Sequence, residues 1–184
     1  TKNLSTLGDA GLVLTNSRER YEQIRALRQY GWHERFYSSE LGLNSRMDEL
    51  HAAILRVRLK YLNFQNEQRA KIAQRYIECL SRFPIKLPTT AHLSSHVFHL
   101  FVIQVENRDE LTSFLNARDI YPGIHYPYAA HQQPAFQKHH LTTQLPVTES
   151  LYQRCLSLPI YASMTSDEVN QVVESVSDWF SSGT

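Results

Sequence analysis

The stretch Val97-Phe-His-Leu-Phe-Val-Ile-Gln-Val105 is apolar at nearly every position and rich in β-branched and aromatic residues. Such a run predicts a β-strand that is covered on both faces. Asn107 then caps a predicted helix with apolar positions at Leu111 and Leu115, and an extended segment follows at 120–126. The sequence therefore predicts a β-α-β unit, and we expect a protein of the α/β or α+β class.

Upstream of this unit, the patterns change several times. Residues 12–14, Leu-Val-Leu, predict a short buried strand, and a helix is expected over 17–29 with its cap at Asn16. Residues 30–45 mix aromatic residues, glycines and charges without a clean period. We interpret that segment as a loop that is long enough to have a function.

A long helix is predicted from about residue 46 until Pro84, with a bend near 63–66. Its first part repeats apolar residues every three or four positions: Met47, Leu50, Ile54, Val57 and Tyr61. Such a stripe packs against another surface.

Downstream of the unit, residues 127–146 predict an ordered loop, because prolines recur there among polar residues. A helix is expected over 147–156. Thr165 and Glu168 then have the spacing of a capping box, which predicts a last helix with an apolar side.

The composition limits the class of protein. The 184 residues carry a formal net charge of +1 with 42% hydrophobic residues, which predicts one domain or two small ones with a proper core. Nineteen Lys and Arg balance eighteen Asp and Glu without forming a stripe, so we expect no nucleic-acid partner. Cys79 and Cys155 both lie in apolar helical patterns, which predicts core thiols in a reducing compartment.

Several motifs are absent from the sequence, and their absence limits the expected location of the protein and the ligands that it is expected to bind. No apolar run approaches the ~18 residues of a membrane span, and no signal peptide is recognised, so we expect a cytoplasmic protein with no membrane partner. Neither the Rossmann nor the Walker glycine pattern occurs. His92, His96 and His99 span a connector and a strand without acidic or cysteine neighbours, so no metal site is expected and His99 is predicted to be a hydrogen-bonded core residue.

Two places have residues suited to chemistry. In Ile124-His125-Tyr126-Pro127 an imidazole and a phenol stand beside a proline turn at a strand end, a common location of ligand contacts. An ordinary turn with aromatic packing explains the same residues equally well. Lys2 precedes a turn at 8–11, and by composition alone it is a solvent-facing lysine.

Five blocks of sequence together resemble the pyridoxal-phosphate-dependent nucleotide-sugar aminotransferases of the DegT/DnrJ/EryC1/StrS family. The blocks are 1–11, 27–31, 44–55, 124–127 and 156–160, in one collinear order up to about residue 180. The resemblance implies the C-terminal half of a fold-type-I transferase. It divides the chain into a large-domain remnant (1–45), a linking helix (46–84) and a small α+β domain (85–184).

The resemblance also gives roles to residues that bind the cofactor. Lys2 matches the lysine that joins pyridoxal 5'-phosphate covalently, and its primary amine suits a nucleophile that later moves a proton. Related sugar dehydratases have histidine at this place, so Lys2 favours the aminotransferase branch. Asn44 matches an asparagine that reaches the cofactor phosphate across a dimer interface, which implies a homodimer with a shared active site.

The substrate-binding residues follow from the same resemblance. His125 and Tyr126 match a pair that contacts the phosphates of the sugar nucleotide. Arg35 lies near the position of a partner-subunit arginine that meets the nucleotide diphosphate, and Tyr37 lies beside it.

The resemblance implies the reaction as well. It is transfer of an amino group from an amino acid, with glutamate as the expected donor, to a keto sugar nucleotide, with a dTDP-3-keto-6-deoxyhexose as the expected acceptor. Such a step serves deoxyamino-sugar, lipopolysaccharide or other cell-surface polysaccharide biosynthesis. The alternatives are a dehydratase-like activity and a catalytically incomplete fragment that acts only in association. The family's aspartate for the pyridine nitrogen precedes the lysine, so we expect these residues alone neither to hold the cofactor tightly nor to transaminate.

Overall fold

The computed structural model describes residues 2–89, 95–137 and 144–182. The chain divides into two compact units, Thr1–Leu62 and Asn63–Thr184. The hydrophobic core lies in the second unit, whereas the first presents many large apolar side chains to solvent. No helix among the described residues is long and apolar enough to cross a membrane.

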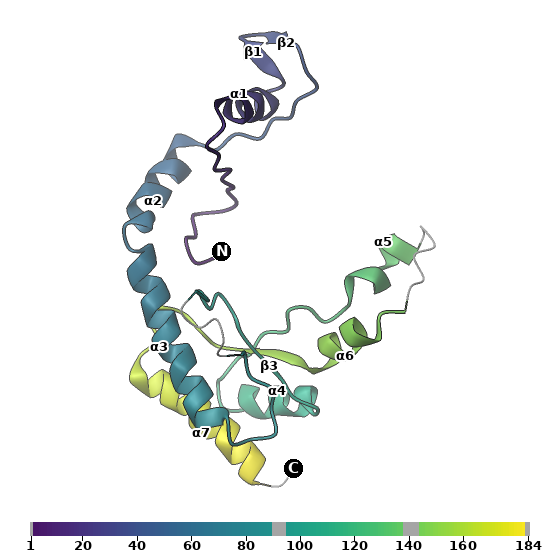
Figure 1. Ribbon diagram of the computed structural model, residues 1–184. Helices are drawn as coiled ribbons and strands as arrows, with labels where there is room; N and C mark the ends of the chain where they lie inside the picture. Colours follow the sequence, from purple (N-terminus) through teal and green to yellow (C-terminus); the bar gives the residue numbers. More distant parts are fainter. Residues whose placement is uncertain (1, 90–94, 138–143, 183–184) are drawn as a thin grey trace. The chain divides into compact units, whose positions relative to one another are not determined.

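A small antiparallel sheet forms the centre of the second unit (Figure 1). Strand β3 (Phe101–Gln104) pairs with β4 (Cys155–Leu158), with Phe101 opposite Leu158 and Gln104 opposite Cys155. Single bridges extend the pairing on both sides, from Lys86 to Gln104 and from Gly123 to Ser157. The predicted strand and the helix after it are present, but the second extended segment of the predicted β-α-β unit forms only the single bridge at Gly123, on β4.

Strand β3 is shorter than the predicted strand over 97–105. Phe98 is buried, but its φ of 41° lies in the left-handed region, which interrupts an extended strand. Along β3 the burial alternates, since Phe101 and Ile103 are buried and Val102 and Gln104 are half-buried. Only one face is fully covered, so the prediction of two covered faces was wrong in extent.

Helices α3 (Leu62–Leu80), α4 (Arg108–Asn116) and α7 (Ser166–Ser181) pack around this sheet. Figure 1 shows α7 lying along α3, and the rings of Phe83 and Phe180 stack 5.1 Å apart at that contact. The capping box is confirmed: the Glu168 amide donates to the Thr165 hydroxyl, and the Thr165 amide donates to the Glu168 carboxylate at 2.7 Å.

The segment between Gly123 and β4 is more helical than predicted. It contains a 3-10 turn (Ala130–Gln132), α5 (Pro134–Gln137) and α6 (Pro146–Arg154), and residues 138–143 lie outside the described part. The predicted helix over 147–156 ends earlier, because β4 begins at Cys155 and pairs with β3. Cys155 is thus a buried strand residue rather than a helical one, and both cysteines are free.

In the first unit, helix α1 (Arg18–Leu27) begins after Ser17, whose hydroxyl accepts from the Arg20 amide, so the predicted cap at Asn16 was wrong by one residue. A hairpin of β1 (Trp32–Glu34) and β2 (Tyr37–Ser38) replaces the predicted loop. Helix α2 (Glu49–Leu59) follows.

The long helix predicted over 46–84 is broken into α2 and α3 at Lys60 and Tyr61, earlier than the expected bend. The amides of these two residues bond to carbonyls three positions back, a tightened last turn that ends α2. Helix α3 itself ends at Leu80, before Pro84. The division into remnant, linking helix and small domain stays a prediction.

Two apolar patterns of the first unit lack the burial that was predicted for them. Leu12, Val13 and Leu14 are exposed and form no strand within the described residues. Leu50 and Val57, in the stripe on α2, are also mostly exposed. Apolarity predicted burial correctly for the core of the second unit, and the packing surface expected for the stripe on α2 stays a prediction.

Candidate functional site

Lys2 lines a cavity of about 190 Å³ in the first unit. The cavity wall is formed by residues 4–6 and 8–12 together with Leu55 on α2. The Arg58 side chain, on α2, donates a hydrogen bond of 2.7 Å to the Leu4 carbonyl. This bond fixes the segment after Lys2 against the helix, so the lysine stands at the edge of a formed cavity.

The hydroxyl of Thr6 is the feature of this cavity that indicates a ligand. Its oxygen is buried and has no hydrogen-bond partner among the described residues. A buried hydroxyl without a partner costs free energy, so such a group in a cavity is suited to a bound polar group. The Lys2 amine lines the same cavity as Thr6, and a primary amine is the group that joins the aldehyde of a cofactor such as pyridoxal 5'-phosphate.

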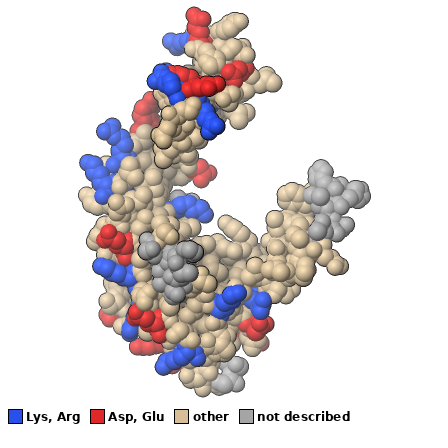
Figure 2. All heavy atoms as spheres, in the orientation of Figure 1, with Lys and Arg blue, Asp and Glu red and all other residues tan. Residues whose placement is uncertain are grey.

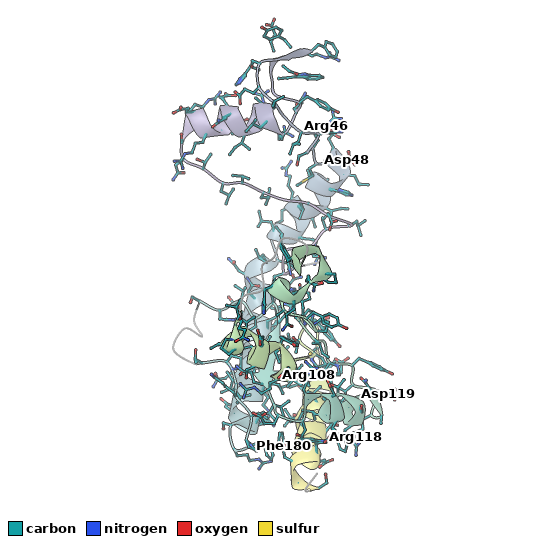
Figure 3. All side chains as sticks on the ribbon, turned by 90° about the vertical axis from the view of Figure 1, so that its right-hand side faces the viewer. Arg46, Asp48, Arg108, Arg118, Asp119 and Phe180 are labelled. Atoms are coloured by element: carbon teal, nitrogen blue, oxygen red, sulfur yellow. The ribbon has the colours of Figure 1, made fainter. Side chains whose placement is uncertain are left out.

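Asn44 lies where the chain leaves the hairpin region and approaches α2. Its backbone bridges to Gln29, and its side-chain oxygen accepts a bond of 3.1 Å from Arg46 Nε. The Arg46 guanidinium also lies 5.8 Å from the Tyr30 ring centre. Figure 3 shows Arg46 and Asp48 near the start of α2. Because the oxygen is engaged, the Asn44 amide presents its N–H groups, which are donors for an anion.

Arg35 and Tyr37 lie at the tip of the hairpin. Both side chains are exposed, and the Arg35 guanidinium stands 4.7 Å over the Phe36 ring. Arg35 also borders a separate cavity of about 240 Å³ whose wall includes Trp32 and His33. The hairpin thus brings Arg35 and Tyr37 together, while neither they nor Asn44 line the Lys2 cavity.

The hairpin is held by a close backbone crossing at Gly31 and Gly42. A Cβ on Gly42 would lie 2.0 Å from the Gly31 amide nitrogen, and Gly31 has a φ of +75°. Only glycine allows both the approach and this backbone conformation. The segment predicted as a loop is therefore an ordered platform for Arg35, Tyr37 and Asn44.

His125 and Tyr126 lie in the second unit, beside the edge of β4. The His125 Nδ1 atom is 2.9 Å from the Ser157 hydroxyl, and its ring meets the Tyr126 ring edge-on at 5.5 Å. Both side chains are exposed. A single bridge at Gly123 takes the place of the predicted extended segment, and the ligand role of His125 and Tyr126 stays a prediction.

Two residues that the sequence did not single out determine where His125 lies. Gly123 and Ser157 exchange backbone hydrogen bonds of 2.9 and 2.7 Å. A Cβ on Gly123 would be 2.6 Å from His125 Cε1, so the imidazole packs directly over the glycine. Ser157 lies in the block 156–160 of the resemblance, but the contact of Ser157 and Gly123 with His125 depends on a pairing between distant segments.

Other polar side chains in the second unit hold the chain beyond β4. Tyr76 donates to the Pro159 carbonyl at 2.9 Å, and burial raises the pKa of its phenol. Arg69 donates to the carbonyls of Phe98 and Ile160, and burial lowers the pKa of its guanidinium. These contacts are structural, because their partners are backbone carbonyls of the core.

The charge distribution and the histidines do not indicate nucleic acid or metal. On the face drawn in Figure 2, Lys and Arg alternate with Asp and Glu instead of forming one basic stripe. The described residues hold no group of three or more His, Cys, Asp or Glu that could bind a metal ion. His99 is half-buried, His96 accepts a bond from the Phe98 amide, and His92 lies outside the described residues.

The chain is similar to known proteins over almost its whole length. A profile of the DegT/DnrJ/EryC1/StrS aminotransferase family matches residues 1–177. The dTDP-3-amino-3,4,6-trideoxy-alpha-D-glucose transaminase of Streptomyces venezuelae is 39% identical, over 97% of this chain and 48% of its own length. The dTDP-3-amino-3,6-dideoxy-alpha-D-galactopyranose transaminase of Aneurinibacillus thermoaerophilus is 40% identical, over 90% of this chain and 46% of its own length.

A solved structure supports the same relationship. The crystal structure of NtdA from Bacillus subtilis with bound cofactor PMP matches with a TM-score of 0.89 at 31% identity, covering 97% of this chain and 43% of that chain. The match confirms the expected fold class, the C-terminal part of a fold-type-I transferase of mixed α/β structure. The chain spans about half the length of the curated relatives it matches.

Proposed function

Since the chain belongs to the DegT/DnrJ/EryC1/StrS aminotransferase family, we propose that the whole protein transfers an amino group from an amino acid to a keto sugar nucleotide with pyridoxal 5'-phosphate. The observation that carries the proposal is Lys2 at the edge of a cavity whose wall includes Thr6, with its buried and unpartnered hydroxyl. When bound, the cofactor supplies an electron sink that makes a proton on the donor's α-carbon acidic.

Lys2 performs two tasks in this proposal. Its amine holds the cofactor at the aldehyde carbon, and after an amino donor displaces it, the same amine carries a proton as base and then as acid. The flexible side chain at the cavity edge permits both positions. An amine here supports transamination over the dehydratase alternative, which the resemblance associates with histidine.

The acceptor in the proposal is a dTDP-3-keto-6-deoxyhexose and the donor is glutamate. Two relatives near 40% identity are named as dTDP-3-amino-sugar transaminases, which supports amination at C3. His125 and Tyr126 contact the substrate phosphates, and Arg35 and Tyr37 contact the nucleotide diphosphate. The product serves deoxyamino-sugar or cell-surface polysaccharide biosynthesis, and the protein acts in the cytoplasm.

We also propose that the protein is a homodimer with shared active sites. Asn44, Arg35 and Tyr37 are exposed and do not line the Lys2 cavity of their own chain, as expected for residues that serve a partner's site. The Asn44 amide, oriented by Arg46, donates to the partner's cofactor phosphate. By this proposal, the 184 residues alone bind the cofactor weakly and do not transaminate.

Borohydride reduction tests the role of Lys2 directly. The complete protein incubated with pyridoxal 5'-phosphate and then reduced should carry the cofactor on the peptide that contains Lys2, as found by mass spectrometry. Lys2→Arg keeps the charge but should abolish this label, whereas Lys60→Arg should keep it. Labelling of Lys60, Lys71 or Lys86 in the unmodified protein, with Lys2 unlabelled, contradicts the proposal.

Subunit complementation tests the shared site. Lys2→Ala should reduce transamination at least about a hundredfold in pure form, a typical loss for removing a group that transfers a proton at the reacting centre. Asn44→Ala should reduce it as well, because the variant loses a hydrogen bond to the cofactor phosphate. When the two complete variants are dissociated and then reassociate together, half of the dimers contain one subunit of each variant. In each such dimer, the intact Lys2 of one subunit meets the intact Asn44 of the other, so one of the two sites is complete. Recovery of roughly a quarter of normal activity is expected from that count. No recovery, although mixed dimers form, shows that each site belongs to one chain.

A further inference from the structure

The hydrogen bond between His125 and Ser157 has a direction that the surroundings of Ser157 determine. Ser157 lies on β4 and is only 4% exposed. Its own amide and carbonyl both bond to Gly123. Among the described residues, the His125 Nδ1 atom, 2.9 Å away, is the hydrogen-bond partner of the Ser157 hydroxyl.

The two directions of this bond differ in cost. If Nδ1–H donated, the proton of the buried hydroxyl would point at no acceptor among the described residues. A buried donor without an acceptor is costly, whereas an oxygen that accepts no bond costs less. The hydroxyl therefore donates to Nδ1, which leaves the proton of a neutral imidazole on Nε2.

The position of the ring is fixed as well as its protonation pattern. The imidazole lies over Gly123, where a Cβ would approach Cε1 to 2.6 Å and Nδ1 to 3.2 Å. Because Gly123 has no side chain, the ring can lie against the sheet edge, and the hydroxyl of Ser157 holds it there. The His125 residue remains exposed.

We propose that Ser157 is a positioning residue that holds neutral His125 in its Nε2–H tautomer, so that the exposed ring offers a hydrogen-bond donor to a phosphate oxygen of the nucleotide sugar. The tautomer follows from the structure, and the phosphate contact rests on the proposed function. An Nε2–H group is present in both the neutral and the protonated ring, so the donor does not depend on protonation. The other tautomer would turn a lone pair towards the anion.

The tautomer is measurable in this chain by two-bond ¹H–¹⁵N correlation spectra of ¹⁵N-histidine-labelled protein at about pH 8.5, where an ordinary imidazole is neutral. His96 is an internal reference, because its Nδ1 accepts a bond of 2.9 Å from the Phe98 amide and it must be the Nε2–H form. His125 should show the same pattern, assigned by its loss in His125→Asn. An Nδ1–H pattern for His125 in the unmodified chain overturns the proposal.

Matched serine variants separate positioning from packing. Ser157→Ala should give a mixture of His125 tautomers, and Ser157→Thr, which keeps the hydroxyl in a strand, should restore the Nε2–H form. Ser175→Ala removes another buried serine, on α7, and should leave the His125 signals unchanged. An unchanged tautomer in a folded Ser157→Ala chain contradicts the proposal.

Binding of dTDP to the complete protein, measured by calorimetry, separates this proposal from the proposed function. Ser157→Ala should weaken dTDP binding about fivefold, of the order expected for one hydrogen bond, and should have no further effect in a His125→Asn background. If His125→Asn leaves the affinity unchanged, the phosphate role of His125 fails while the tautomer stands. If His125→Asn weakens binding but Ser157→Ala does not, the positioning role fails.

Discussion

The two compact units of the chain place their apolar side chains differently. In the second unit Phe101 and Leu115 have no exposed surface, and both belong to one continuous core. In the first unit Leu50 is 67% exposed and Leu14 is 90% exposed, although both lie in clearly apolar patterns. The comparison shows that the second unit has a hydrophobic core built from its own residues, whereas the first unit buries few of its large apolar side chains by itself.

This difference matters for the proposed chemistry. Lys2, Asn44 and the hairpin with Arg35 all belong to the unit that has little core of its own. His125 belongs to the unit that has one, and β4 holds it there. By the proposed function, the residues assigned to the cofactor need the assembled whole protein, whereas the hydrogen bond that holds His125 forms within the second unit.

The largest expected effect comes from a matched pair of leucine variants, which tests the difference between the two units. Leu115→Ala on α4 should lower the free energy of unfolding by about 2–5 kcal/mol, because it removes buried methyl groups and leaves a cavity. Leu50→Ala on α2 should change it by less than about 0.5 kcal/mol, the range for exposed positions. Urea unfolding followed by circular dichroism measures both. Equal losses would show that the two units form one cooperative core in solution.

The sequence predicted the elements whose signals are local. Capping and periodicity lie within one or two turns of helix, so α4 and α7 were predicted correctly, and the Thr165 capping box was found three residues from its partner. Hairpin β1–β2 and strand β4 were not predicted. Both are short, and each forms because a partner strand pairs with it. A local pattern of four residues or fewer does not encode such a pairing.

Local sequence patterns were equally insufficient to predict the candidate site. Asn44, Arg35 and Tyr37 were proposed through resemblance alone. His125 and Tyr126 stood out by their chemistry at an expected strand end, but only the resemblance gave a role to them and to Lys2. Ser157 was missed because its hydroxyl meets a residue 32 positions away. An apolar run such as Leu12-Val13-Leu14 predicted burial, but burial needs a covering surface that the run itself does not specify.

The smallest expected effect concerns the acid sensitivity of the second unit. Hydrogen bonds from the Thr165 amide, the Tyr161 hydroxyl and the Thr165 hydroxyl hold the pKa of Glu168 below its ordinary value of 4.5. A lowered folded-state pKa means that the ionised carboxylate contributes stability above pH 4.5, and that this contribution is lost as the pH falls through the lowered value. The capping box should therefore weaken only in acid.

Glu168→Gln tests this expectation, because glutamine keeps the capping-box geometry but does not ionise. The melting temperature of the variant, followed between about pH 7 and pH 3, should be lower than normal at neutral pH and should converge with the unmodified protein in acid. Glu174→Gln changes an exposed glutamate on the same helix outside the capping box, and it serves as the control. A constant gap between Glu168→Gln and the unmodified protein at every pH would mean that packing around Glu168, and not its charge, stabilises the start of α7.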